Sequence, residues 1–158
     1  MRAALWRRAF YSTTAAVPPK TTNKQVYLEV FGCQMNVNDA ELVCGILKQH
    51  GYERTEDPAH ANVALLMTCS VREAAEDKAW NRLDWLASMQ KKTIGPCKKP
   101  TLHTIGVLGC MAERLKLAVF ERKPFIDVVC GPDSYRSLPQ LLASAESGTK
   151  AVDVDLSM

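Results

Sequence analysis

The chain has 158 residues, 47% of them hydrophobic and 23% charged, which predicts one globular domain with its own core. No apolar run approaches the roughly 20 residues that cross a bilayer, so a membrane-spanning protein is excluded and no membrane partner is expected. The net charge of +3 comes from residues 1–23, which hold four basic side chains and no acid. The remainder is nearly neutral and shows no electrostatic sign of a nucleic-acid binder by itself.

Residues 1–23 have the composition of a mitochondrial transit peptide. The segment MRAALWRRAFYSTTAAVPPK is rich in Arg, Ala, Ser and Thr and lacks the long apolar stretch of a secretory signal. We therefore expect a location in the mitochondrial matrix and leave this segment out of the fold. The alternative is a disordered basic tail.

Strands and helices are predicted to alternate along the rest of the chain. Strands are expected at residues 26–31, 62–68, 104–109, 125–129 and 151–156. Helices are expected at residues 39–52, from a capping box at Ser70 and Glu73 to about Gln90, at 112–122 and at 138–147. This alternation predicts an α/β fold, a parallel sheet of about five strands with helices on both faces, flavodoxin-like or Rossmann-like.

Cysteines follow the strands of this predicted sheet. Because the carboxyl ends of parallel strands share one edge, four thiols are expected on the same rim. They are Cys33, Cys69, Cys110 and Cys130. The glycines before Cys33 and Cys110 would allow sharp turns, and the following helix N-termini would favour thiolate. Cys44 is expected in the core, and Cys97 is expected to be a free surface thiol.

Thiolates from separate loops suit an iron–sulfur cluster or a less regular zinc site, since no C-x-x-C pair is present. A matrix location argues for reduced thiols rather than disulfides. No G-x-G-x-x-G follows the first strand, which disfavours a dinucleotide site.

Three cysteine-containing segments resemble the motifs of the MiaB-type tRNA methylthiotransferase family. They are FGCQMNVNDAE (31–41), LLMTCSVREAAEDK (65–78) and IGVLGCMAER (105–114). The segment VVCGPDSYRSLPQLL (128–142) is similar to the one that closes the same domain in that family. The resemblance covers roughly residues 25–145, and with its presequence the chain most resembles a mitochondrial member.

The resemblance implies that Cys33, Cys69 and Cys110 bind a 4Fe-4S cluster with one iron left open. That cluster would help to supply the sulfur of 2-methylthio-N6-isopentenyladenosine in mitochondrial tRNA. In the family, S-adenosylmethionine and a second 4Fe-4S cluster belong to a radical S-adenosylmethionine domain. Gln34 and Asn36 are expected to line the site. Ser70, Arg72 and Glu73 are expected to organise the second motif, and no residue is assigned as catalytic.

The sequence departs from the family in lacking the C-x-x-x-C-x-x-C of the radical domain. We expect residues 24–148 to form the N-terminal iron–sulfur domain and residues 149–158 to begin a linker or last strand before the radical domain. These residues alone are then not expected to be catalytically competent. Cys130 stands where the family has a small residue without a thiol. It is expected to pack near the site, or else to be a fourth ligand.

Two other functions stay open at the level of sequence. One is a non-catalytic interaction protein that binds a cyclin-dependent kinase activator subunit, an association known for the mitochondrial member that the chain resembles. The other is a zinc or thiol-redox domain on a flavodoxin-like fold, for which Cys130 is the discriminating residue.

Overall fold

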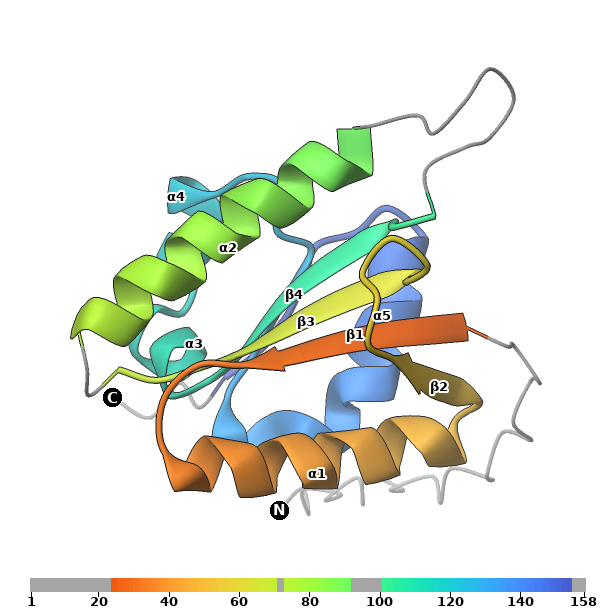
Figure 1. Cartoon of the computed structure of the whole chain (residues 1–158), viewed down its shortest axis with the longest axis horizontal. Helices are drawn as coiled ribbons and strands as arrows, with labels where there is room; N and C mark the ends of the chain where they lie inside the picture. Colours follow the sequence, from red (N-terminus) through yellow and green to blue (C-terminus); the bar gives the residue numbers. More distant parts are fainter. Residues whose placement is uncertain (1–23, 71–72, 92–100, 155–158) are drawn as a thin grey trace, which may run out of the picture.

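A six-stranded parallel sheet forms the centre of the molecule. The computed structural model describes residues 24–70, 73–91 and 101–154 (Figure 1). The strand order is β2-β1-β3-β4-β5-β6, and every pairing is parallel. The strands are β1 (Lys24–Val30), β2 (Tyr52–Thr55), β3 (Val63–Thr68), β4 (Thr104–Gly109), β5 (Val128–Cys130) and β6 (Ala151–Asp153). The predicted α/β class is confirmed.

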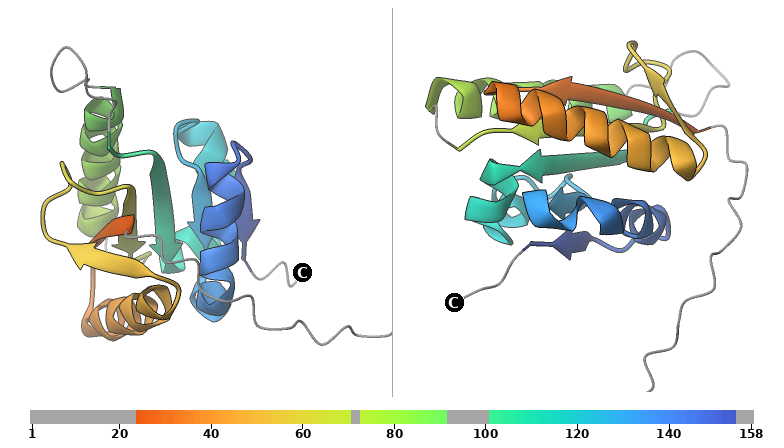
Figure 2. Two further views of the ribbon diagram at one scale, coloured as in Figure 1. Left: turned by 90° about the vertical axis from the view of Figure 1, so that its right-hand side faces the viewer. Right: turned by 90° about the horizontal axis from the view of Figure 1, so that it is seen from below.

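Helices cover both faces of the sheet, and Figure 2 shows the layers from two further sides. They are α1 (Gln34–Gln49), α2 (Glu73–Lys91), α3 (Cys110–Leu115), α4 (Ala118–Arg122), the 3-10 turn η1 (Pro132–Ser137) and α5 (Leu138–Glu146). One core cluster joins the sheet to α2, α3 and α4, and the other joins it to α1, η1 and α5. The central strands β3 and β4 are buried at every position, as doubly covered strands must be. No helix in the described ranges combines the length and the apolar character that a membrane crossing requires.

The structure corrects several predicted boundaries. The expected helix at 39–52 begins earlier, at Gln34, and ends at Gln49. Its N-cap is Cys33, whose side chain makes no capping hydrogen bond, so no sequence signal marked this start. The expected helix at 112–122 divides into α3 and α4 at Lys116, which has a φ of 49°. The fourth predicted strand, 125–129, is shifted toward Cys130.

The sixth strand, β2, was not expected. It is four residues long and lies at the edge of the sheet, where only Tyr52 is buried. Such a segment shows neither the continuous apolar run of a central strand nor a clear alternation. Its pairing with β1 therefore depends on tertiary contacts that the sequence pattern does not report.

Candidate functional site

The order of the strands reverses between β1 and β3. The chain passes from β1 through α1 to β2 on one side, and β3 then lies on the other side of β1. The connecting helices α1 and α2 consequently lie on opposite faces of the sheet (Figure 1). In open α/β sheets, a crevice for ligands forms at such a switch point, outside the carboxyl ends of the strands.

Three of the cysteines predicted for this rim follow adjacent strands. Cys33 comes after β1, Cys69 directly after β3 and Cys110 directly after β4. Thr68 is paired in register with Gly109, so Cys69 and Cys110 occupy the next position on neighbouring strands. The switch point therefore lies beside all three thiols.

Gly32 lets the loop that carries Cys33 pack tightly onto Cys69. It has a φ of +130°, a conformation that side-chain-bearing residues rarely adopt. A Cβ at this position would lie 2.4 Å from the Cβ of Cys69 and 2.7 Å from the Nδ2 of Asn36. Asn36 in turn donates from Nδ2 to the carbonyl oxygen of Phe31 at 2.8 Å, which holds the turn closed.

The thiols influence one another electrostatically. The backbone N–H groups of Asn36 and Met35 lower the pKa of Cys33, and a hydrogen bond with the Cys69 side chain lowers it further. Burial raises the pKa of Cys110, and negative charge on Cys69, Cys33 and Asp39 raises it as well. The structure thus brings Cys33, Cys69 and Cys110 together, and it favours the thiolate form of Cys33 over that of Cys110.

Cys130 has a different environment although it ends β5. Its side chain is fully buried in the core cluster beneath α1 and α5. Its thiol lies 3.6 Å from the carbonyl oxygen of Gly131, and burial raises its pKa to about 12. This thiol is held in its neutral form, which does not favour a role as a metal ligand.

The buried side chain of Tyr135 contacts residues close to the thiols, although Tyr135 is far from them in sequence. The sequence alone predicts no role for it. The hydroxyl of Tyr135, in η1, donates to Oδ2 of Asp39 at 3.3 Å and lies 3.2 Å from the sulfur of Met67. Burial, and then the Asp39 carboxylate, raise the pKa of Tyr135 strongly. Both residues lie inside the segments that resemble the family, but nothing in their sequence context marks them as partners.

Some of the other predicted site residues lie within the part of the chain that the structure describes, and some lie outside it. Asn36 is fully buried beside Gly32, and its Oδ1 is the one buried side-chain polar atom of the described residues without a hydrogen-bond partner. Gln34 is exposed and Ser70 half-buried. Cys44 is half-buried and lines a cavity, so its predicted place in the core was wrong in part. Arg72, Cys97 and the side chain of Glu73 lie outside the described residues.

The three thiols have the donor chemistry of an iron–sulfur cluster site. Among the described residues, no three His, Cys, Asp or Glu side chains are grouped closely enough to hold one metal ion. Cysteine thiolates are the usual ligands of iron–sulfur clusters. Three strand-end cysteines, with a backbone environment that favours thiolate at Cys33, supply that donor set.

A parallel α/β domain with three cysteines at its switch point is the architecture expected for the N-terminal domain of a methylthiotransferase. Residues 25–131 match the family described as "Uncharacterized protein family UPF0004", and the chain belongs to that family.

Relatives of the chain are named as tRNA-modifying enzymes. It is 52% identical over 135 residues to the human "Mitochondrial tRNA methylthiotransferase CDK5RAP1", and the aligned region makes up 85% of this chain and 22% of that protein. It is 46% identical over 135 residues to a "tRNA-2-methylthio-N(6)-dimethylallyladenosine synthase" of Porphyromonas gingivalis, covering 85% of this chain and 28% of the relative. A rice "CDK5RAP1-like protein" is 43% identical over 147 residues, 89% of this chain and 24% of its own length. The chain therefore spans about a quarter of the length of these relatives.

Proposed function

We propose that residues 24–148 of this chain form the iron–sulfur-binding domain of a mitochondrial tRNA methylthiotransferase. The observation that carries the proposal is the convergence of Cys33, Cys69 and Cys110 at the switch point of the sheet. The names of the relatives, tRNA methylthiotransferase and tRNA-2-methylthio-N(6)-dimethylallyladenosine synthase, support the reaction class.

The three cysteines would hold a 4Fe-4S cluster as thiolates. When bound, the cluster would leave one iron without a protein ligand and help to supply the sulfur that is inserted into the tRNA base. The chain's own residues prepare the site. The backbone N–H groups of Met35 and Asn36 stabilise the Cys33 thiolate, and Gly32 keeps the loop close to Cys69. Cys130 stays in the core as a neutral thiol.

The proposed substrate is mitochondrial tRNA, and the proposed product is 2-methylthio-N6-isopentenyladenosine. The name of the human relative supports a mitochondrial location, and we propose the matrix on the basis of the composition of residues 1–23. The step that uses S-adenosylmethionine is not assigned to these residues, because their sequence contains no C-x-x-x-C-x-x-C. We assign to them the cluster and its surroundings only.

The proposal is tested by anaerobic reconstitution of the full 158-residue chain with iron and sulfide, with zinc as a competitor. About four irons and four sulfides per chain are expected. Replacement of Cys33, Cys69 or Cys110 by alanine should in each case abolish stoichiometric binding of iron and sulfide. Cys130→Ala and Cys44→Ala are the matched controls and should retain this binding. Zinc binding that depends on Cys130, or no metal binding at all, would overturn the proposal.

A further inference from the structure

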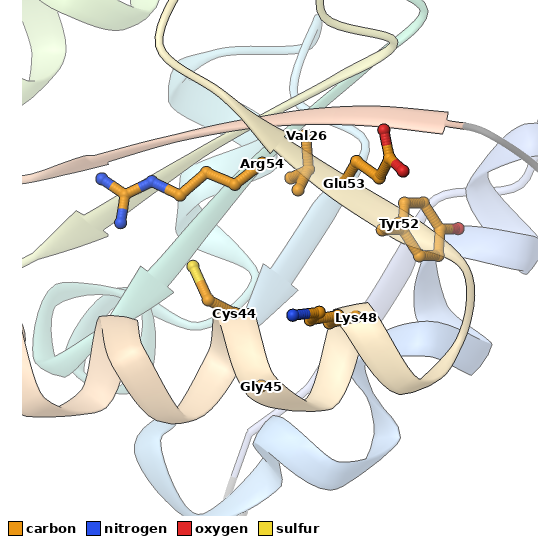
Figure 3. Close-up of a pocket in the computed structure, with 7 residues that line it drawn as sticks. All are labelled: Val26, Cys44, Gly45, Lys48, Tyr52, Glu53 and Arg54. Carbon is orange, nitrogen blue, oxygen red and sulfur yellow. The ribbon is translucent and has the colours of Figure 1, made fainter.

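A cavity lies between α1 and the edge strand β2, on the flank of the sheet. Its volume is about 300 Å³, and Figure 3 shows the side chains that line it. Cys44 stands three turns of α1 beyond Cys33, and Tyr52 begins β2 at the end of the sheet opposite to the cysteine rim. The cavity is therefore separate from the proposed cluster site.

The walls of the cavity are largely apolar, and its charged lining residues are Lys48, Arg54 and Glu53. Val26 and Tyr52 are buried and form the wall on the side of the sheet. Lys48 also lines the cavity and takes part in no ion pair or hydrogen bond of its side chain within the described ranges. An ammonium group without a counter-ion beside an apolar wall attracts an anion that has an apolar body.

Arg54 adds a second positive charge. Its guanidinium lies close enough to Cys44 to act on the pKa of that thiol, although burial has the larger effect and raises the pKa. Within the described ranges, Arg54 forms an ion pair with the exposed carboxylate of Glu56, at 3.3 Å, and Arg54 is itself half-exposed. Glu53, the acidic lining residue, points away from α1 in Figure 3 and accepts a hydrogen bond from Gln25 at 3.1 Å. Lys48 and Arg54 are thus the cationic residues of the lining, while the carboxylates of Glu41 and Glu56 lie near enough to Cys44 to raise its pKa.

Gly45 lies in the middle of α1 at the cavity. Glycine in a helix interior costs about 1 kcal/mol relative to alanine. Its φ is not positive, and a Cβ at this position would meet no atom within 4 Å. Neither conformation nor packing in the described part of the chain requires glycine here, whereas a ligand in the cavity would use the space that the missing side chain leaves.

We propose that this cavity binds a small organic anion, a carboxylate or phosphate ester whose apolar body contacts Val26 and Tyr52 and whose charge lies between Lys48 and Arg54. The size is suitable, because an apolar cavity of about 150 Å³ already holds benzene. The binding does not depend on the proposed cluster, so each proposal can fail without the other.

The test uses phenyl phosphate as the probe, added to the isotope-labelled full chain and followed by the amide chemical shifts of α1 and β2. Phenol supplies the same ring without the charge, and inorganic phosphate supplies the charge without the ring. A second readout is the rate at which iodoacetamide alkylates Cys44, measured by peptide mass spectrometry. Lys48→Gln and Gly45→Leu alter the cavity, and Lys78→Gln, at an exposed lysine of α2, is the matched control.

Phenyl phosphate is expected to shift these amides saturably and to slow the alkylation of Cys44. Phenol and inorganic phosphate should each bind at least about tenfold more weakly. Lys48→Gln should weaken binding about tenfold, Gly45→Leu should abolish it, and Lys78→Gln should leave it unchanged. Equal binding of phenol, equal binding of inorganic phosphate, no saturable shift, or insensitivity to both cavity variants would each overturn the proposal.

Discussion

Gly32 and Cys69 approach each other so closely that position 32 has no room for a side chain, since a Cβ there would lie 2.4 Å from the Cβ of Cys69. The contact joins the loop after β1 to the end of β3, which are separate segments of the chain. The geometry of the thiol trio thus depends on a residue that cannot itself bind a metal.

Replacement of Gly32 by alanine should lower the free energy of unfolding by about 3 kcal/mol, because strain at a positive φ and overpacking against Cys69 act together. The measurement is urea denaturation of the metal-free chain. Gly45→Ala is the control, since it meets no atom within 4 Å and should raise the free energy of unfolding by about 1 kcal/mol. Equal stabilities of the two variants would contradict the prediction.

The thiols should react with iodoacetamide in a fixed order as the pH of the metal-free chain is raised. Thiolate is the reactive form, so a lower pKa means reaction at lower pH. Backbone N–H groups lower the pKa of Cys33, burial raises that of Cys110, and burial raises that of Cys130 to about 12. Among these three thiols, peptide mass spectrometry should find Cys33 modified at the lowest pH and Cys130 at the highest.

The control for this order is the chain unfolded in urea, where the thiols should titrate together near their ordinary pKa of about 8.5. If the folded chain showed the same uniform behaviour, the backbone environment assigned to Cys33 would be wrong.

Loss of the Tyr135 hydroxyl should destabilise the fold, because it donates to Asp39 in a buried setting. Tyr135→Phe is expected to lower the free energy of unfolding by about 1–2 kcal/mol, measured by chemical denaturation. Tyr52→Phe is the matched control, because the Tyr52 hydroxyl has no hydrogen-bond partner in the described ranges, and a change below about 0.5 kcal/mol is expected. A larger effect at Tyr52 than at Tyr135 would refute this account.

Asp127 should make stability depend on pH in the acidic range. Burial raises its pKa, although Oδ2 accepts a hydrogen bond from the Ile105 N–H at 2.9 Å. A carboxyl whose folded-state pKa is raised binds its proton more tightly when folded, so its contribution is present at low pH and is lost as pH rises through that pKa.

Asn at position 127 keeps an acceptor for the Ile105 N–H but does not titrate. The stability of Asp127→Asn relative to the original chain should therefore increase from about pH 3 to about pH 6. Thermal or urea unfolding across this range measures the difference. A constant or falling difference would show that the carboxylate is not disfavoured by the fold.

The central strands could be predicted from the sequence because their apolar runs are continuous, as in VALLMT and TIGVLG. Their carboxyl ends then located Cys69 and Cys110 on one rim. Cys33 joined them because FGC follows an apolar run, and the order of β1, β3 and β4 places the three side by side. The local pattern and the topology agree here because the sheet is buried on both faces.

Other features depend on contacts between distant segments and could not be predicted. The equivalence of Cys130 with the other strand-end thiols fails because β5 ends inside the core cluster rather than at the switch point. The pairing of Tyr135 with Asp39 joins η1 to α1 across most of the domain, and no periodicity encodes it. Likewise, the short edge strand β2 forms only because β1 offers it a partner.

The positions of the thiols on three adjacent strands have a consequence for the stability of the domain. A group bound by Cys33, Cys69 and Cys110 together would act as a three-way cross-link, closing one loop through α1 and β2 and a second loop through α2. Cross-links of this length restrict the unfolded chain and stabilise a domain by several kcal/mol in the chain-entropy description. A group bound at the rim would thus stabilise the whole sheet as well as the site, and its loss would lower the free energy of unfolding of the entire domain.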